Sequence, residues 1–254
     1  MVVIGLGSGR SGTASLSNLI NEQPDSVCFH ELNPACVKFE GTPQPVLNTV
    51  REFRAIVEGG DPRMLSVDFT RPVAERRYRD LLQMSKVRVI GDIAHYYLRY
   101  VEDIHRADPQ VRFVCLVRDR EATIRSWIGK MAIRRWPSRW VADRISSLIM
   151  RAPFHRARNH WIEHDGSRWM PDPVWDKCFP KYPANGLREA LEQYYDEYYR
   201  RAAVLAERLP ERFMVVRTES LGAEAGQGAI LDFLGYPPDG RVVANAHVHR
   251  SDAD

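Results

Sequence analysis

One stretch decides the fold of this chain: Val2-Val3-Ile4-Gly5-Leu6 is an apolar run, and Gly7-Ser8-Gly9-Arg10-Ser11-Gly12-Thr13 follows it before a helical pattern begins. Strand, glycine-rich turn and helix N-terminus, in that order, aim backbone N–H groups and the positive end of a helix dipole at an anion. Glycine also lets the backbone approach a phosphate without a Cβ in the way. We therefore expect a phosphate site formed by Gly9, Arg10, Ser11, Gly12, Thr13 and Ala14.

The spacing from Gly7 to Gly12 is that of a P-loop, G-x-x-x-x-G. The Lys that should follow the second glycine is absent, because Thr13 comes directly after Gly12. The cation instead lies inside the loop, at Arg10. A lone G-x-x-x-x-G is weak evidence, but the displaced cation distinguishes this loop from those of kinases and NTPases.

A second strand-to-helix junction lies further along the chain. Phe113–Val117 is apolar and β-branched without alternation, which is typical of a buried parallel strand. Arg118 follows at its carboxyl end, and Asp119 is a candidate N-cap for the next helix. Ser126 is expected on that helix, so that Arg118 and Ser126 both reach one second phosphate.

These motifs resemble those of the PAPS-dependent sulfotransferases. Residues 7–13 look like that family's 5′-phosphosulfate loop, and Arg118 with Ser126 looks like its 3′-phosphate pair. The family's usual Pro two residues after the Arg is replaced by Arg120. Phe213-Met214-Val215-Val216-Arg217-Thr218-Glu219-Ser220-Leu221 is similar to the R-x-E-x-L element near the family's C-terminal end.

The resemblance implies a P-loop-like sulfotransferase fold. It covers the nucleotide scaffold, residues 1–130 and 187–237, and does not extend to the middle of the chain. The implied donor is 3′-phosphoadenosine-5′-phosphosulfate (PAPS), and the implied product is adenosine 3′,5′-bisphosphate (PAP). A sulfuryl group carries less negative charge than a phosphoryl group, so we expect transfer to be independent of metal.

The coarse layout alternates strands and helices, which predicts an α/β fold with a mostly parallel sheet flanked by helices. We expect one domain over 1–254, with an acceptor-side insertion at 131–186 and a C-terminal tail at 238–254. The expected strands are Val2–Leu6, Ser26–His30, Leu65–Phe69, Val87–Gly91, Phe113–Val117 and Phe213–Arg217. The expected helices are Ser15–Asn21, Val46–Val57, Val73–Met84, Tyr96–Arg106, Glu121–Ile133, Leu187–Leu209 and Glu224–Leu234.

The insertion differs in composition from the scaffold. All six tryptophans lie between Trp127 and Trp175, and nine Lys or Arg residues stand against three acidic ones from Lys130 to Arg168. Two interpretations stay open. The aromatic residues form the small core of an irregular subdomain, or they stack on an acceptor that the arginines attract.

Sulfuryl transfer needs a base for the acceptor hydroxyl, and the candidates follow strands. Glu31 comes after the second strand, where the resemblance suggests the base of several glycan-modifying members, and alternation puts His30 on the opposite face. We expect partial burial near phosphates to raise the pKa of Glu31. Asp92 and His95 follow the next core strand, near the place of a catalytic His in cytosolic small-molecule members. Asp68 is a weaker candidate.

The composition limits the classes of protein to which the chain can belong. A net charge of +3 over 254 residues does not argue for nucleic acid, and no apolar run is long enough to span a membrane. The four cysteines show no metal-binding spacing and are typical of reduced structural thiols. The chain opens in its first strand, so we expect no signal peptide and a cytoplasmic location.

The sequence therefore predicts a sulfotransferase that uses PAPS and modifies a hydroxyl or amine of a carbohydrate or small-metabolite acceptor. A P-loop small-molecule kinase is the first alternative, favoured by the loop and opposed by the missing Lys. A non-catalytic nucleotide-binding protein is the second, and the carboxylates Glu31 and Asp92 argue against it. The identity of the acceptor and the oligomeric state are left open.

Overall fold

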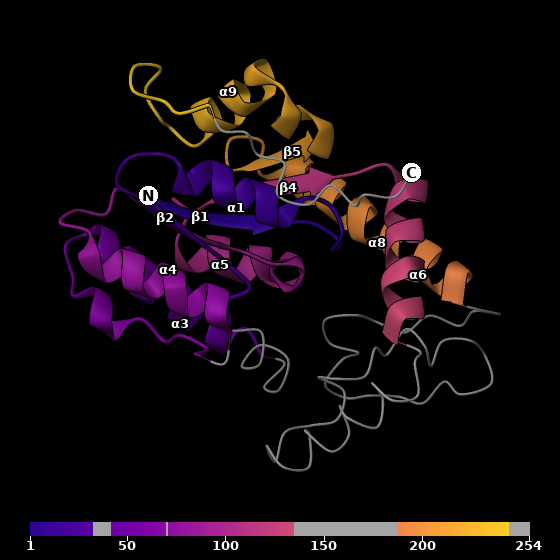
Figure 1. Cartoon of the computed structure of the whole chain (residues 1–254), viewed down its shortest axis with the longest axis horizontal. Helices are drawn as coiled ribbons and strands as arrows, with labels where there is room; N and C mark the ends of the chain where they lie inside the picture. The colour runs from indigo at the N-terminus through magenta and orange to yellow at the C-terminus, as the bar shows by residue number, and fades with distance from the viewer. Residues whose placement is uncertain (33–41, 70, 135–186, 244–254) are drawn as a thin grey trace, which may run out of the picture. The chain divides into compact units, whose positions relative to one another are not determined.

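The computed structural model describes residues 1–32, 42–69, 71–134 and 187–243 (Figure 1). The chain divides into two compact units, one formed by Met1–Arg118 with Arg200–Asp254 and the other by Asp119–Tyr199. The insertion from 135 on and the end of the tail lie outside the described residues. None of the described helices is long and apolar enough to cross a membrane.

The first unit contains a parallel sheet of five strands in the order β2-β3-β1-β4-β5. This confirms the predicted α/β fold. The strands are β1 (Val2–Leu6), β2 (Ser26–His30), β3 (Val89–Ile93), β4 (Arg112–Val117) and β5 (Phe213–Arg217). The order of the strands reverses at β1, and ligands of such sheets bind beyond the carboxyl ends of the strands at this point.

Helices cover the sheet. One face carries α1 (Thr13–Asn21) and α9 (Glu224–Phe233), whose Leu16 and Leu231 share a core cluster with strand residues. On β1, four of the five residues are apolar and fully buried, as parallel strands covered on both faces require. The other helices of this unit include α3 (Gln44–Val57), α4 (Pro72–Gln83), α5 (Val101–Ala107) and the end of α8 (Leu187–Arg208).

Two expected elements differ from the structure. Leu65–Phe69 was predicted as a strand, but it is a connection after the short 3-10 turn η1 (Pro62–Met64). Leu65 alone of this run is buried and Phe69 is 57% exposed, so the segment has no face to offer a sheet. The helix predicted over Tyr96–Arg106 begins as the 3-10 helix η2 (His95–Tyr100) and becomes α5 only at Val101.

The end of β3 also differs from the prediction. The strand runs to Ile93, two residues beyond the expected end, because it pairs with both β1 and β2 up to that residue. Asp92 therefore lies inside the strand and is fully buried, whereas the sequence had placed it in the following loop. This shift changes the chemistry that Asp92 can perform.

In the second unit, α6 (Arg120–Arg134) begins one residue before the predicted start at Glu121. Asp119 Oδ1 accepts the N–H of Ala122 at 2.8 Å, as expected of an N-cap. Trp127 is 8% exposed and is therefore part of a core. The other five tryptophans lie outside the described residues, so neither interpretation of the Trp-rich segment is tested.

Candidate functional site

The loop between β1 and α1 has an unusual backbone. Gly9, Arg10 and Gly12 have φ angles of 80°, 58° and 84°, all in the left-handed region. Glycine adopts this region without strain, whereas Arg10 does so at a cost. A Cβ on Gly12 would lie 2.6 Å from Thr218 Cγ2, so only glycine fits there. Turns of this kind gather successive N–H groups into an anion-binding concavity.

The loop is fastened from the far end of the chain. Thr218 follows β5 and opens the 3-10 turn η6 (Thr218–Gly222). Its hydroxyl lies 2.7 Å from Ser11 O and 3.3 Å from Val117 O, so it can donate to either carbonyl. The sequence included Thr218 in a matching segment but assigned it no role. Its function is visible only once β4 and β5 are side by side.

Two cations meet at this loop. Arg118, at the end of β4, donates from Nη1 to Arg10 O at 3.0 Å. Burial, and then the charge of Arg118, lower the pKa of Arg10 below its ordinary value. A lowered arginine pKa marks positive charge that is costly by itself and that a bound anion would offset. Ser126, the predicted partner of Arg118, lies on α6 in the second unit, so their joint role remains a prediction.

The polar groups of the loop fit a phosphate or sulfuryl oxygen. Ser11 Oγ is buried and has no hydrogen-bond partner among the described residues. A Cβ on Gly7 would lie 2.2 Å from this oxygen, so only glycine at position 7 leaves room for the Ser11 hydroxyl. Thr13 and Ala14 open α1, where N–H groups have no partner within a helix. The donor set therefore matches an anionic ligand.

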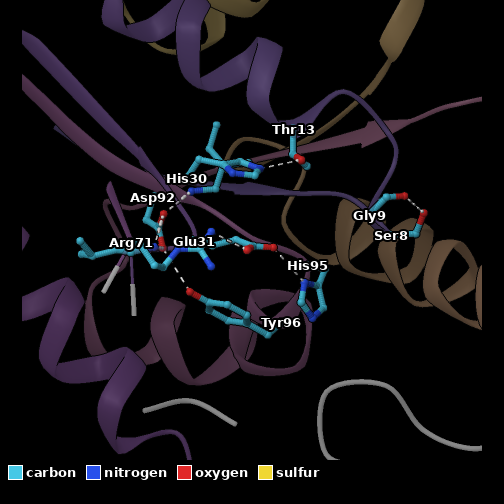
Figure 2. A network of polar contacts seen from close by, with 11 residues as sticks. Ser8, Gly9, Thr13, His30, Glu31, Arg71, Asp92, His95 and Tyr96 are labelled. Carbon is cyan, nitrogen blue, oxygen red and sulfur yellow. Dashed lines mark hydrogen bonds and ion pairs between the residues drawn. The ribbon is translucent and has the colours of Figure 1, made fainter. Parts of the chain in front are cut away.

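A second cluster lies at the ends of β2 and β3 (Figure 2). Glu31 directly follows β2, has a φ of 56°, and donates its N–H to Ile93 O at 3.1 Å. Arg71, the N-cap residue of α4, donates from Nη2 to Glu31 Oε2 at 2.9 Å. His95 Nδ1 lies 3.8 Å from Glu31 Oε1. The carboxylate thus faces a cation on one side and an imidazole on the other.

The charge state of Glu31 differs from the expectation. Burial raises its pKa, but His95, followed by His30 and Arg71, lowers it more, so that the pKa of Glu31 lies well below its usual range. The predicted raised pKa is therefore wrong, because the sequence did not show that basic side chains would gather around this carboxylate. Glu31 is therefore ionised at neutral pH and can accept a proton, but the lowered pKa makes it a weaker base than an ordinary carboxylate.

Asp92 is the opposite case. It is fully buried, and burial raises its pKa, although hydrogen bonds from Tyr97 and Leu32 oppose that shift. Because Leu32 follows Glu31, Asp92 fixes the turn that carries the candidate base. Its donors are the N–H groups of Leu32 and Ile93 and the hydroxyl groups of Tyr96 and Tyr97, at 2.7–3.3 Å.

The two histidines of this cluster have different partners. His95 opens η2, is 7% exposed and packs edge-on against Tyr96, with ring centroids 5.4 Å apart. His30 ends β2, and its Nε2 lies 3.0 Å from Thr13 Oγ1 (Figure 2). His30 therefore contacts the start of α1, beside the glycine-rich loop, while its neighbour Glu31 contacts Arg71.

The structure thus assembles most of the predicted site and adds to it. Residues 9–14 and Arg118 gather beyond β1 and β4, and Glu31, Asp92 and His95 gather beyond β2 and β3. Arg71 was not foreseen, because it lies between the strand predicted over Leu65–Phe69 and the helix predicted from Val73, in a connection with no site role. Asp68, the weaker candidate, donates its N–H to Leu32 O at 3.4 Å and so lies beside the turn.

A family model described as a sulfotransferase domain matches residues 2–241, and the chain belongs to this family. No curated protein matches the chain significantly. The match spans both strand-to-helix junctions, at residues 7–13 and at Arg118, as well as the Glu31 cluster, and it agrees with the resemblance seen in the motifs. The class of protein is therefore a sulfotransferase, a transferase enzyme.

Two solved structures are similar to the chain. A sulfotransferase from Alicyclobacillus acidocaldarius is 14% identical, with a TM-score of 0.50, over 98% of this chain and 86% of the other. At this identity the likeness supports the fold alone. The sulfotransferase domain from the curacin biosynthetic pathway is 15% identical, with a TM-score of 0.43, over 94% of this chain and 75% of that one.

Proposed function

We propose that the chain transfers a sulfuryl group from PAPS to a hydroxyl or amine of a carbohydrate or small-metabolite acceptor and releases PAP. The observation that carries this proposal is the loop of residues 7–13, with three left-handed residues, a buried serine hydroxyl and two arginines brought together. A 5′-phosphosulfate is an anion whose charge and oxygens match these groups.

On the donor side, the N–H groups of residues 9–14 hold the 5′-phosphate. Arg10 binds the bridging and sulfuryl oxygens, where its planar fork suits an oxyanion and offsets charge that builds on the leaving phosphate. Arg118, and from the sequence motif Ser126, take the 3′-phosphate. Arg118 also bonds to Arg10 O, so the two phosphate contacts support one another.

On the acceptor side, Glu31 is the general base. It accepts the proton of the acceptor hydroxyl as the acceptor oxygen forms a bond to sulfur and the bond between sulfur and the phosphate oxygen breaks. The leaving electron pair stays on the phosphate of PAP, next to Arg10. Glu31 is favoured over His95 and Asp92 because its side chain is 29% exposed, against 7% for His95 and full burial for Asp92.

His95 is the alternative base, with Glu31 then stabilising the imidazolium. Asp92 is proposed as a positioning residue, because its oxygens already accept four donors. The Trp-rich segment is proposed as the acceptor platform on the strength of its sequence. We also keep a cytoplasmic location as a proposal, since Cys28 and Cys115 are buried free thiols.

The test is an activity assay with labelled PAPS and a panel of glycans, phenols and lipid-linked sugars, in buffer with excess EDTA. We expect transfer to one acceptor class with no loss in EDTA, because the loop lacks the Lys-Ser/Thr pair that positions magnesium. Phosphorylation from ATP that EDTA abolishes would instead establish a kinase. PAP binding without transfer to any acceptor would favour the non-catalytic alternative.

A further inference from the structure

The side chain of His30 links the end of β2, next to Glu31, to the loop between β1 and α1. His30 is the last residue of β2, and its Nε2 lies 3.0 Å from the hydroxyl oxygen of Thr13, the first residue of α1 (Figure 2). The residue after His30 is Glu31, whose pKa His30 helps to lower. A single residue therefore joins the loop proposed to hold the donor to the turn proposed to hold the base.

The side chain of Thr13 is held on two sides. A Cβ on Gly7 would lie 3.1 Å from Thr13 Cγ2, so the methyl group faces the start of the loop. The hydroxyl group faces His30. Because a β-branched side chain has few χ1 rotamers, these contacts keep the hydroxyl oxygen at one place beside the loop.

The position of the proton in the hydrogen bond between His30 and Thr13 decides whether the Thr13 hydroxyl can donate to another group. A hydroxyl group has one proton to donate and two lone pairs that accept. If His30 Nε2 accepts, the proton of Thr13 is used on the imidazole. If Nε2–H donates instead, Thr13 keeps its proton for another acceptor. An anion only accepts hydrogen bonds, so a loop that holds one favours the second arrangement.

We propose that His30 is a positioning residue for the sulfate donor, which donates from Nε2–H to Thr13 Oγ1 so that the hydroxyl proton of Thr13 is directed at the 5′-phosphate. This inference rests on the proposed function, since it needs a 5′-phosphate in the loop. It extends that function, because it links the end of β2 to the affinity of the loop for its ligand. Glu31 follows the same strand.

A double-mutant cycle tests the coupling. Calorimetry would measure the binding of PAP, and of adenosine 3′-monophosphate as a ligand that lacks the 5′-phosphate, to His30→Leu, Thr13→Val and the double variant. A neutral hydrogen bond accounts for about a two- to tenfold change in affinity. We expect a loss of this size for PAP in each single variant, no larger loss in the double variant, and no loss for adenosine 3′-monophosphate.

Two further variants serve as controls. His30→Gln places an amide N–H near the position of Nε2 and should retain PAP affinity within about twofold, whereas a purely space-filling role would not be rescued by Gln. His105→Leu removes another partly buried histidine, on α5, and should leave PAP binding unchanged. Losses for His30→Leu and Thr13→Val that multiply in the double variant would overturn the proposal.

The tautomer can be read with the nucleotide bound. Nitrogen-15 NMR of the full chain saturated with PAP at pH 8 should show the proton of His30 on Nε2, and a bare Nε2 with the proton on Nδ1 would overturn the proposal. The two possible failures are separable. A wild-type chain that binds no PAP overturns the proposed function and this inference with it, whereas equal PAP affinity in wild type and His30→Leu overturns the inference alone.

Discussion

Arg10 and Glu31 both adopt a left-handed backbone conformation, but the turns that hold them are built in different ways. Both are non-glycine residues in the left-handed region, with φ angles of 58° and 56°. The turn at Arg10 takes its backbone shape from glycines within a few residues, and Arg118 and Thr218 fasten it from further along the chain. The turn at Glu31 is held by side chains from distant segments: Arg71, Asp92 and His95.

This difference shows two ways to hold a functional side chain in a strained position. A mainly local device takes its shape from a short motif, and distant side chains only fasten that shape. A tertiary device depends on several elements at once, so changes far away in the sequence alter the chemistry of the residue it holds. Substitutions at the two turns should therefore remove different properties of the protein.

The largest effect is expected at the turn of β2. Glu31→Gln keeps the shape of the side chain and removes the proton acceptor, so turnover should fall by about 10²–10⁴-fold while PAP affinity stays unchanged. Steady-state kinetics and calorimetry measure the two quantities. Asp25→Asn is the matched control, since Asp25 is an exposed acidic residue with a similar φ of 55°. Near-normal turnover of Glu31→Gln beside an inactive His95→Ala would make His95 the base.

The loop should show the next largest effect. Arg10→Ala removes the cation that we assign to the leaving phosphate, so turnover should fall by about a hundredfold or more, with a smaller loss of donor affinity. Arg10→Lys should recover part of the rate, because it restores the charge but not the planar fork. An alanine variant with normal turnover would remove Arg10 from the mechanism.

The affinity for PAP should fall when the Arg118 side chain is removed. Removal of a charge-assisted contact in Arg118→Ala should weaken PAP by about ten- to a hundredfold. AMP, which lacks the 3′-phosphate, should lose much less, and what it loses reflects the bond from Arg118 to Arg10 O. Calorimetry with both nucleotides measures the difference. Equal losses would mean that Arg118 acts through the loop alone.

The contributions of Glu31 and Asp92 to the free energy of unfolding should change with pH in opposite directions. The pKa of Glu31 is lowered by folding, so its contribution is present above its ordinary pKa of 4.5 and disappears as the pH falls toward the lowered value. Chemical denaturation should find Glu31→Gln less stable than wild type by about 1 kcal/mol at pH 7, with the gap closing below about pH 4. Asp92, whose pKa is raised, acts the other way: its ionisation costs stability as the pH rises above 3.8.

Backbone strain should give the smallest effect and the same one at both turns. Glycine accepts a left-handed φ that alanine resists, so Arg10→Gly and Glu31→Gly should each be about 1 kcal/mol more stable than the corresponding alanine variant. Thermal denaturation of the four inactive variants measures this. A difference at only one turn would show that the other relaxes once its side chain is gone.

The sequence by itself determined most of the sheet and the loop that follows β1. β1, β2 and β5 have the predicted bounds, because apolar strands, glycine spacing and caps are local signals. The same local signals identified the loop and Arg118, and they indicated the sulfotransferase family from residues that lie close together in the chain. Glu31 and His95 were selected because they follow strands, and the sheet does bring them within 3.8 Å of one another.

Tertiary structure decided the chemistry of those residues. The pairing of β3 with both β1 and β2 carries Asp92 into the core, and the start of α4 places Arg71 against Glu31. The sequence could not give the lowered pKa of Glu31 or the contact of Thr218 with the loop, since these partners, apart from His30, are 40 to 207 residues away along the chain. A pKa or a clamped loop depends on distances through space, and only the packed sheet fixes those distances.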